Sequence, residues 1–355
     1  MRLLLLIAIF LVPFGPVQAE EVSSSRAKKY SRTLRALLQA KDEDELARFI
    51  DRMGELDHPR SVVLIAPAAT LFPSRANYDR ALGVIGSLEN PEAVEALIKA
   101  FQKTKNLDDK VLLLDSFGHR EDDASARVLV ESFGSKPPRL QVTGLRAAGR
   151  RKLKAAVTPL IDMVTEHSAE RDLPWLESRR ALLKITGQDF DSAADGKKWW
   201  DSAEASFDPK EAPEEDGRTV VVRKSGAAVE FFGAELFSRK LIFVIDVSGS
   251  MAMYDQGELK RKEAEKTRVR LERARKQLIS AIEGLPKTAR FNIIVYSDKI
   301  TTWQKSLRPA SRSAIKSANR FVKGFLARGG THTDEALARA LADSEADTIV
   351  LLSDG

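Results

Sequence analysis

The sequence predicts a multidomain protein in which an all-α repeat array precedes an α/β domain with a doubly wound, mostly parallel sheet. Three observations support this prediction. Glycines end apolar helical segments at intervals of about 30 residues, a period typical of stacked helical hairpins. After residue 240, apolar runs alternate with amphipathic segments, as in strand–helix units. An acidic, proline-containing stretch separates the two patterns.

Composition narrows the possible functions. The 355 residues include no cysteine and only four histidines, which excludes disulfides, thiolate metal sites and cysteine nucleophiles and disfavours a histidine-rich zinc site. The net charge of +6 is modest, and the one dense basic stretch, 260–276, contains no aromatic residue on which a base could stack. We interpret that stretch as the solvated face of a long helix and expect no nucleic-acid partner.

The amino terminus has the pattern of a signal peptide over residues 1–19. Arg2 precedes an apolar run, Leu3 to Val12, and Val17-Gln18-Ala19 matches a small-x-small cleavage site. An uncleaved anchor is the alternative, although the run is short for a membrane span. We expect an exported protein, periplasmic or extracellular, with no integral membrane segment beyond the signal peptide. Residues 20–32 are polar and serine-rich and are predicted to be a flexible leader.

Helical periodicity begins near Thr33 and continues to residue 201. Apolar helices end at Gly86, Gly118 and Gly149, and each is followed by a second helix with small-then-large apolar spacing. This pattern resembles HEAT-type repeats, although degenerate, and implies a helical solenoid over 33–201. Residues 202–217, rich in Asp, Glu and Pro, are predicted to be a linker.

The predicted α/β domain begins after a β-hairpin within 218–239, in which Thr219–Val222 would pair with Ala228–Phe232. Strands are expected where apolar, β-branched runs occur, and helices where apolar residues recur at three- and four-residue steps. The expected strands are Leu241–Ile245, Phe291–Tyr296, an edge strand at Ile300–Trp303, and Thr348–Leu352. The expected helices surround Leu271–Ile282 and span Ala314–Phe325 and Glu335–Ala342.

Oxygen-bearing side chains follow two of these strands. Asp246, Ser248 and Ser250 form an Asp-x-Ser-x-Ser loop after the first strand, and Asp354 follows the last. Thr331 belongs to a Gly-Gly-Thr turn between them. Because open α/β sheets bind ligands at the carboxyl ends of their strands, we expect these five residues to converge there. Carboxylates and hydroxyls are hard donors that suit Mg²⁺ rather than zinc or copper.

This ordered set resembles the metal-ion-dependent adhesion site of von Willebrand factor A domains. The resemblance covers 240–355 and implies a Rossmann-like fold that binds Mg²⁺, or Mn²⁺ or Ca²⁺ in its place. It implies direct ligation by Ser248 and Ser250, direct or water-mediated ligation by Thr331, and charge from Asp246 and Asp354. An open coordination position would recruit a carboxylate of a partner protein. Family domains continue with two more strands, so the domain is expected to be incomplete at its carboxyl end.

The leading functional hypothesis is therefore an exported, metal-ion-dependent protein-binding module without enzymatic activity. One alternative is a helical-repeat scaffold whose metal site does not function. A hydrolase is a weaker alternative. Phosphatases that use a strand-end Asp carry a second Asp two residues later, where this chain has Ser248. A serine hydrolase would need a Gly-x-Ser-x-Gly motif, which the loop around Ser248 lacks.

Overall fold

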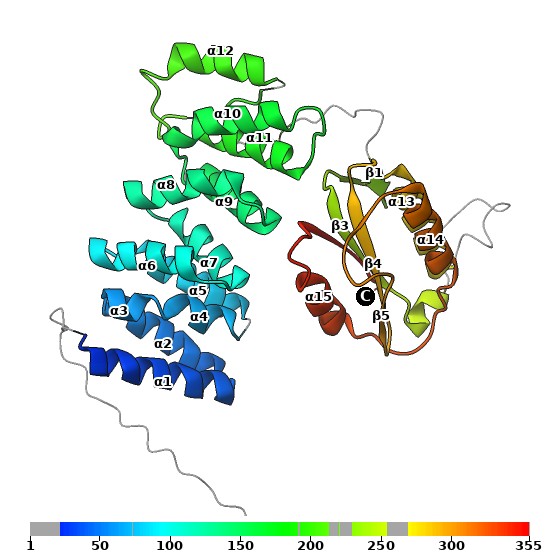
Figure 1. Cartoon of the computed structure of the whole chain (residues 1–355), viewed down its shortest axis with the longest axis horizontal. Coiled ribbons are helices and arrows are strands. Elements are labelled where there is room, and N and C mark those ends of the chain that lie inside the picture. Colours follow the sequence, from blue (N-terminus) through cyan, green and yellow to red (C-terminus); the bar gives the residue numbers. More distant parts are fainter. Residues whose placement is uncertain are drawn as a thin grey trace, which may run out of the picture. The chain divides into compact units, whose positions relative to one another are not determined.

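The computed structural model describes residues 22–72, 74–190, 192–212, 220, 229–253 and 269–354. The chain divides into two compact units, residues 1–104 and 105–355. Figure 1 labels the helices and strands of the chain. The predicted signal peptide, 1–19, lies outside the described residues and stays a prediction. Within the described ranges, no helix is both long enough and apolar enough to cross a membrane.

The first unit is helical throughout its described secondary structure. Side-chain oxygens cap several helix starts: Ser23 Oγ accepts from the Arg26 amide at 3.2 Å, and Asp42 Oδ1 accepts from the Glu45 amide at 3.0 Å. The helices are α1 Ser24–Ala40, α2 Glu43–Glu55, α3 Pro59–Val62, α4 Ile65–Thr70, α5 Arg75–Gly86 and α6 Pro91–Lys103.

Helix α1 corrects one sequence prediction. The predicted flexible leader, 20–32, is helical from Ser24 onward. The serines that suggested a loose segment instead supply the cap at Ser23, and the Ala, Lys and Arg residues that follow are good helix formers. The hydrophobic periodicity of the sequence does not indicate a helix start at Ser24, because Leu34 is the only buried residue of α1.

The second unit begins with further helices. The described residues between 22 and 203 contain no strand, which confirms the predicted all-α region; the assignment to HEAT-type repeats stays a prediction. Helix α9 packs against α7 and α11, and α10 packs against α11 and α12. The helices are α7 Leu107–Phe117, α8 Asp123–Glu131, α9 Pro138–Arg150, α10 Val157–Glu166, α11 Leu173–Thr186 and α12 Ala193–Ala203, with short 3₁₀ turns at Ser132–Gly134 and Lys154–Ala156.

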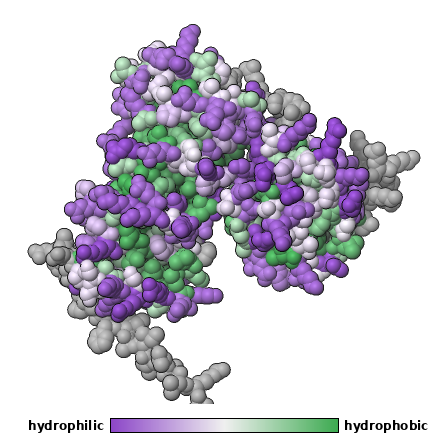
Figure 2. Space-filling view, viewed as in Figure 1, coloured by the Kyte–Doolittle hydropathy of each residue, from purple (hydrophilic) through white to green (hydrophobic). Residues whose placement is uncertain are grey.

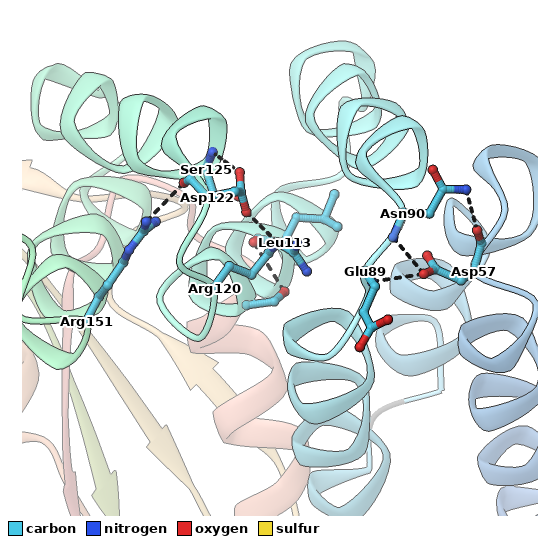
Figure 3. Close-up of polar contacts among 9 residues, drawn as sticks. Asp57, Glu89, Asn90, Leu113, Arg120, Asp122, Ser125 and Arg151 are labelled. Atoms are coloured by element: carbon cyan, nitrogen blue, oxygen red, sulfur yellow. Dashed lines mark hydrogen bonds and ion pairs between the residues drawn. The ribbon is translucent and has the colours of Figure 1, made fainter.

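Aspartates at turns tie successive helical hairpins together within each unit (Figure 3). In the first unit, Asp57 Oδ2 accepts from the backbone amides of Glu89 and Asn90 at 2.9 and 2.8 Å. In the second, Arg151 donates to the backbone carbonyl of Asp122 at 3.0 Å. Each contact joins residues roughly one repeat length apart, so each turn is fixed by the hairpin that follows it.

The recurring glycines mark close approaches between helices. A Cβ added at Gly118, just after α7, would lie 2.8 Å from Ala147 Cβ and 3.0 Å from Ala147 Cα in α9. A Cβ added at Gly149 would lie 3.0 Å from Ala181 Cα in α11. The period in the sequence therefore reflects helix contacts that leave no room for a side chain. Figure 2 shows apolar surface between hydrophilic ridges on the helical part of the chain.

A half-buried histidine–carboxylate pair precedes α11. His167 Nδ1 lies 3.0 Å from Asp172 Oδ2, and Asp172 Oδ1 accepts from the Trp175 amide at 3.3 Å as the helix cap. The hydrogen bond that His167 donates to the Asp172 carboxylate raises the pKa of His167 above its ordinary value. The charged form of the pair therefore stabilises the start of α11.

The α/β domain contains a two-stranded hairpin and a five-stranded sheet. In the larger sheet, β3 pairs in parallel with β4 and β7, while β5 and β6 pair antiparallel with β4. The elements are β1 Val229–Phe231, β2 Ala234–Leu236, β3 Lys240–Asp246, α13 Arg270–Gly284, β4 Arg290–Tyr296, β5 Ile300–Thr302, β6 Arg308–Pro309, α14 Arg312–Lys323, α15 Thr333–Leu341 and β7 Thr348–Leu352, with a 3₁₀ turn at Gly249–Ala252. The predicted fold class, helices followed by an α/β domain, is confirmed.

Helices cover both faces of the sheet. Leu241, Phe243 and Ile245 of β3 share a core with α13 and α14, whereas Ile242 and Val244 share a second core with α15. Figure 1 shows α13 and α14 on one side of β3 and β4 and α15 on the other. Strand β3 is thus buried on both faces, as its continuous apolar run predicted.

The hairpin that the structure describes uses a partner strand that the sequence did not predict. Val229–Phe231 pairs with Ala234–Leu236, whereas the predicted pairing with Thr219–Val222, of which only Val220 is described, lies outside the described residues and stays a prediction. Phe232 and Gly233 form the two-residue turn with φ values of +49° and +79°. A turn with two positive φ values matches the twist of a hairpin. The Phe-Gly pair gives little sign of such a turn in the sequence, because Phe rarely adopts positive φ.

We expect Gly118→Ala to lower the free energy of unfolding by about 1–3 kcal/mol, because the added methyl meets backbone atoms of Ala147. Gly83→Ala is the matched control: it lies inside α5 with nothing within 4 Å of the added Cβ, and should be neutral or stabilising by up to about 1 kcal/mol. Urea unfolding followed by circular dichroism measures both. Unchanged stability of Gly118→Ala would contradict the close approach.

We expect stability of the helical region to fall as pH rises through the raised pKa of His167. A raised pKa in the folded state means that the contribution is complete below the unfolded pKa and is lost above the folded one. Asp172→Asn keeps the cap but removes the charge, so its stability should depend less on pH across this window. Thermal unfolding at a series of pH values tests this, and parallel curves for the two proteins would contradict it.

Candidate metal-binding site

The candidate site lies at the carboxyl edge of the sheet, where the strand order reverses. The chain crosses from β3 to β4 on one side and later to β7 on the other, so the loop after β3 lies between the ends of its two neighbours. The Val247 amide donates to the Tyr296 carbonyl of β4 at 2.9 Å, which fixes the start of this loop. Local hydrogen bonds thus hold the 246–250 segment at the switch point.

Asp246 is a fully buried carboxylate at the end of β3, with 0% of its surface exposed. Its Oδ1 accepts from the Ser248 amide at 2.7 Å, and its Oδ2 accepts from the Ser353 hydroxyl at 3.1 Å. Both donors are neutral, and Asp246 forms no ion pair with any residue that the structure describes. Because a buried charge ordinarily pairs with a cation or coordinates a metal, this environment suits a bound cation.

Ser248, whose amide binds Asp246, and Ser250 link Asp246 to the second carboxylate, Asp354. Ser248, 2% exposed, has its Oγ 3.0 Å from Ser250 Oγ. Ser250 Oγ in turn donates to Asp354 Oδ1 at 3.0 Å, across 104 residues of sequence. Four of the five predicted residues therefore form one contiguous cluster of oxygens, while their role as metal ligands stays a prediction.

The glycine turn that carries Thr331 reaches the same edge through its backbone. The Gly249 amide donates to the Gly329 carbonyl at 3.0 Å, and the Arg328 amide donates to the Val247 carbonyl at 2.9 Å. Thr331 itself is exposed and follows directly after this contact. The structure therefore places the Thr331 loop against the Asp-x-Ser-x-Ser loop.

Asp298, two residues after β4, braces that turn. Its Oδ1 accepts from the Gly330 amide, and a Cβ added at Gly329 would lie 2.1 Å from its Oδ2. Gly329 also has a φ of +77°, a conformation that a side chain disfavours. The turn thus needs glycine for both backbone and steric reasons, which the sequence alone showed only as a glycine pair.

Arg270 contributes a positive charge to the cluster. Its Nη1 lies 2.5 Å from Asp354 Oδ2, with side chains 30% and 10% exposed. The interpretation of 260–276 as a solvated helix face is therefore wrong at Arg270; residues 260–268 lie outside the described ranges, and α13 begins at Arg270. A helical charge pattern cannot reveal this pairing, because the partner is 84 residues distant.

The donor set fits a hard divalent cation. Two carboxylates and two hydroxyls face one another, and hard oxygen donors of this kind bind Mg²⁺, Mn²⁺ or Ca²⁺. Over the described part of the chain, no three His, Asp or Glu side chains gather into a metal-binding cluster. An ion at this site would therefore depend on the serine hydroxyls as much as on the carboxylates.

Comparison with known proteins identifies the domain. Residues 241–355 match the model of the family described as von Willebrand factor type A domain, which confirms the resemblance that the loop motif suggested. Inter-alpha-trypsin inhibitor heavy chain H4 from Homo sapiens is 31% identical over 147 residues, covering 37% of this chain and 14% of that protein. Heavy chain H3 from Bos taurus is 29% identical over 146 residues, covering 37% of this chain and 15% of that protein.

A third relative, heavy chain H2 from Mesocricetus auratus, is 26% identical over 146 residues, again 37% of this chain and 14% of that protein. The chain thus spans about a seventh of the length of these curated relatives. The similarity establishes the type of domain at the carboxyl-terminal part of the chain, and the properties of the whole relatives do not follow from it.

We expect Gly329→Ala to destabilise the α/β domain by about 1–3 kcal/mol, because its φ is positive and the new methyl would collide with Asp298. In an Asp298→Ala background the collision is absent and only the backbone cost remains, so the double mutant should lose less than the sum of the single losses. Urea unfolding of the four proteins measures this coupling. Strictly additive losses would show that Asp298 does not brace the turn.

Proposed function

We propose that this protein is an exported, metal-ion-dependent protein-binding module. In this proposal the cluster at the carboxyl edge holds Mg²⁺, or Mn²⁺ or Ca²⁺ in its place, as a metal-ion-dependent adhesion site. The helical region provides a second, separate surface for interactions. Export rests on the signal-peptide pattern of residues 1–19.

Each residue of the cluster has a role in the proposed site. Ser248 and Ser250 would ligate the ion through their hydroxyls, and Thr331 would do so directly or through water. Asp246 and Asp354 would supply negative charge, in part through water, because Mg²⁺ gives up its hydration shell reluctantly. A bound ion held by neutral hydroxyls would keep strong Lewis acidity toward a carboxylate from a partner protein.

The buried carboxylate of Asp246 is the observation that carries the proposal. A fully buried charge held by two neutral donors is costly unless a cation compensates it. The remaining donors of the cluster are oxygens of the type that Mg²⁺ prefers. A purely structural loop would satisfy the same backbone groups with Asn or Ser at residue 246 at lower cost.

The ion pair between Arg270 and Asp354 favours a second candidate function. In that alternative the guanidinium balances the charge of the cluster permanently, the metal site does not function, and the helical region alone acts as a scaffold. A hydrolytic role gains no support, since Ser248 stands where phosphatases of the strand-end Asp type carry their second carboxylate. Metal titration separates the two remaining candidates.

We expect saturating Mg²⁺ to raise the thermal unfolding temperature of the α/β domain, because an ion that binds only the folded state stabilises it by about 2.7 kcal/mol at 100 times its dissociation constant. Asp246→Asn keeps the size and hydrogen-bonding capacity of the side chain but removes its charge, and should abolish the shift. Asp343→Asn, in the loop before β7 at the amino edge of the sheet, should retain the full shift as a matched control.

Binding to a partner extends the same test. Full-length protein, with and without EDTA, is compared for retention of an aspartate-bearing and an asparagine-bearing peptide on a surface. Retention that requires both metal and the carboxylate supports the adhesion site. Absence of any Mg²⁺-dependent thermal shift in the unmodified protein would instead favour the scaffold with a non-functional site.

A further inference from the structure

We propose that Arg270 is a built-in competitor of the divalent cation, which occupies Asp354 when no metal is bound and must release it when one binds. The inference rests on the proposed function, since it assumes that the cluster binds a metal. It adds a regulatory residue, outside the five predicted ligands, that sets how much free metal the site requires.

The two oxygens of Asp354 are both engaged. Oδ1 accepts from Ser250 and thereby joins the hydroxyl cluster, while Oδ2 lies 2.5 Å from Arg270 Nη1. With Asp354 only 10% exposed, this charge-assisted bond is well shielded from water. A metal that draws on the charge of Asp354 therefore competes with a guanidinium already in contact with that carboxylate.

The position of Arg270 in its helix points to the same role. Arg270 is the first residue of α13, and the helix start has Val269 at the cap position with no side-chain cap bond. The amino end of a helix carries partial positive charge, so a cation there is unfavourable for the helix itself. The pairing with Asp354 offsets this cost, so the placement serves the site rather than the helix.

Release of Asp354 would not require the backbone to move. The Arg270 amide donates to the Met253 carbonyl at 3.1 Å, which anchors the start of α13 beside the end of the Asp-x-Ser-x-Ser loop. The Arg270 side chain is 30% exposed, so its guanidinium can turn toward water while this anchor remains. Exchange between guanidinium and metal can therefore proceed while the hydrogen bond of the Arg270 amide stays in place.

The competition makes a specific prediction about affinity. Without metal, the guanidinium of Arg270 compensates the charge of Asp354, and this ion pair stabilises the folded domain. The charge of Asp246 then has no compensating cation among the described residues. When a metal binds, the ion and the guanidinium of Arg270 would both lie next to the Asp354 carboxylate, so repulsion between them weakens ion binding. Removing its charge should therefore tighten Mg²⁺ binding and, at the same time, destabilise the metal-free protein.

The experiment compares Mg²⁺ dissociation constants by calorimetric titration of the full chain. We expect Arg270→Gln to bind Mg²⁺ about tenfold more tightly than the unmodified protein, and to unfold at a lower temperature in EDTA. Arg270→Lys preserves the charge and should stay close to the unmodified affinity. Lys276→Gln, an exposed residue of α13, removes the same charge away from the site and should change neither quantity.

Each other outcome is decisive. Equal dissociation constants for Arg270→Gln and the unmodified protein, or weaker binding by the variant, would overturn the competition while leaving the metal site intact. Absence of Mg²⁺ binding in both proteins would overturn the proposed metal site and the competition together. An equal gain in affinity from Lys276→Gln would assign the effect to net charge and overturn the role of Arg270.

Discussion

Burial of β3 on both faces is the constraint from which the organisation of the α/β domain follows. Its apolar side chains alternate between the core shared with α13 and α14 and the core shared with α15. Because β3 is paired on both sides and covered on both faces, polar side chains can follow its apolar run only at the ends of the strand. The polar loop at 246–250 is therefore held between the ends of β4 and β7, and Asp246 remains out of water although it carries charge.

This placement makes charge balance the central property of the site. Asp246 accepts from the Ser248 amide and Asp354 accepts from the Ser250 hydroxyl, so the two carboxylates belong to one hydrogen-bonded cluster, in which Arg270 pairs with Asp354. Asp246 is satisfied in its hydrogen bonds but not in its charge. The hydrogen bonds of the cluster thus form without a metal, but the described residues do not compensate the charge of Asp246, and a divalent ion would do so.

The elements that the sequence predicted well are those specified by local pattern. Apolar runs predicted β3, β4 and β7 to within a residue, and the strand-end rule predicted that Asp246 and Asp354 lie at one edge of the sheet. The failures depend on contacts between distant residues. Arg270 and Asp298 join the site through partners in other loops, and the hairpin formed around a Phe-Gly turn with no strong local signal. Likewise, the glycine period indicated recurring helix ends, but only the structure showed that Ala147 and Ala181 fill the space opposite Gly118 and Gly149.

The hydrogen bond between the Arg270 amide and the Met253 carbonyl has a further consequence for the architecture of the chain. It fixes Met253, which follows β3 and the 3₁₀ turn, within hydrogen-bond distance of Arg270, the first residue of α13, although 17 positions separate the two residues in the sequence. The entropy of closing a flexible loop grows only with the logarithm of its length, by about 0.6 kcal/mol for each doubling. Sequence could therefore be inserted or exchanged between these two residues, to carry a label or a binding peptide beside the cluster, with little strain on the sheet.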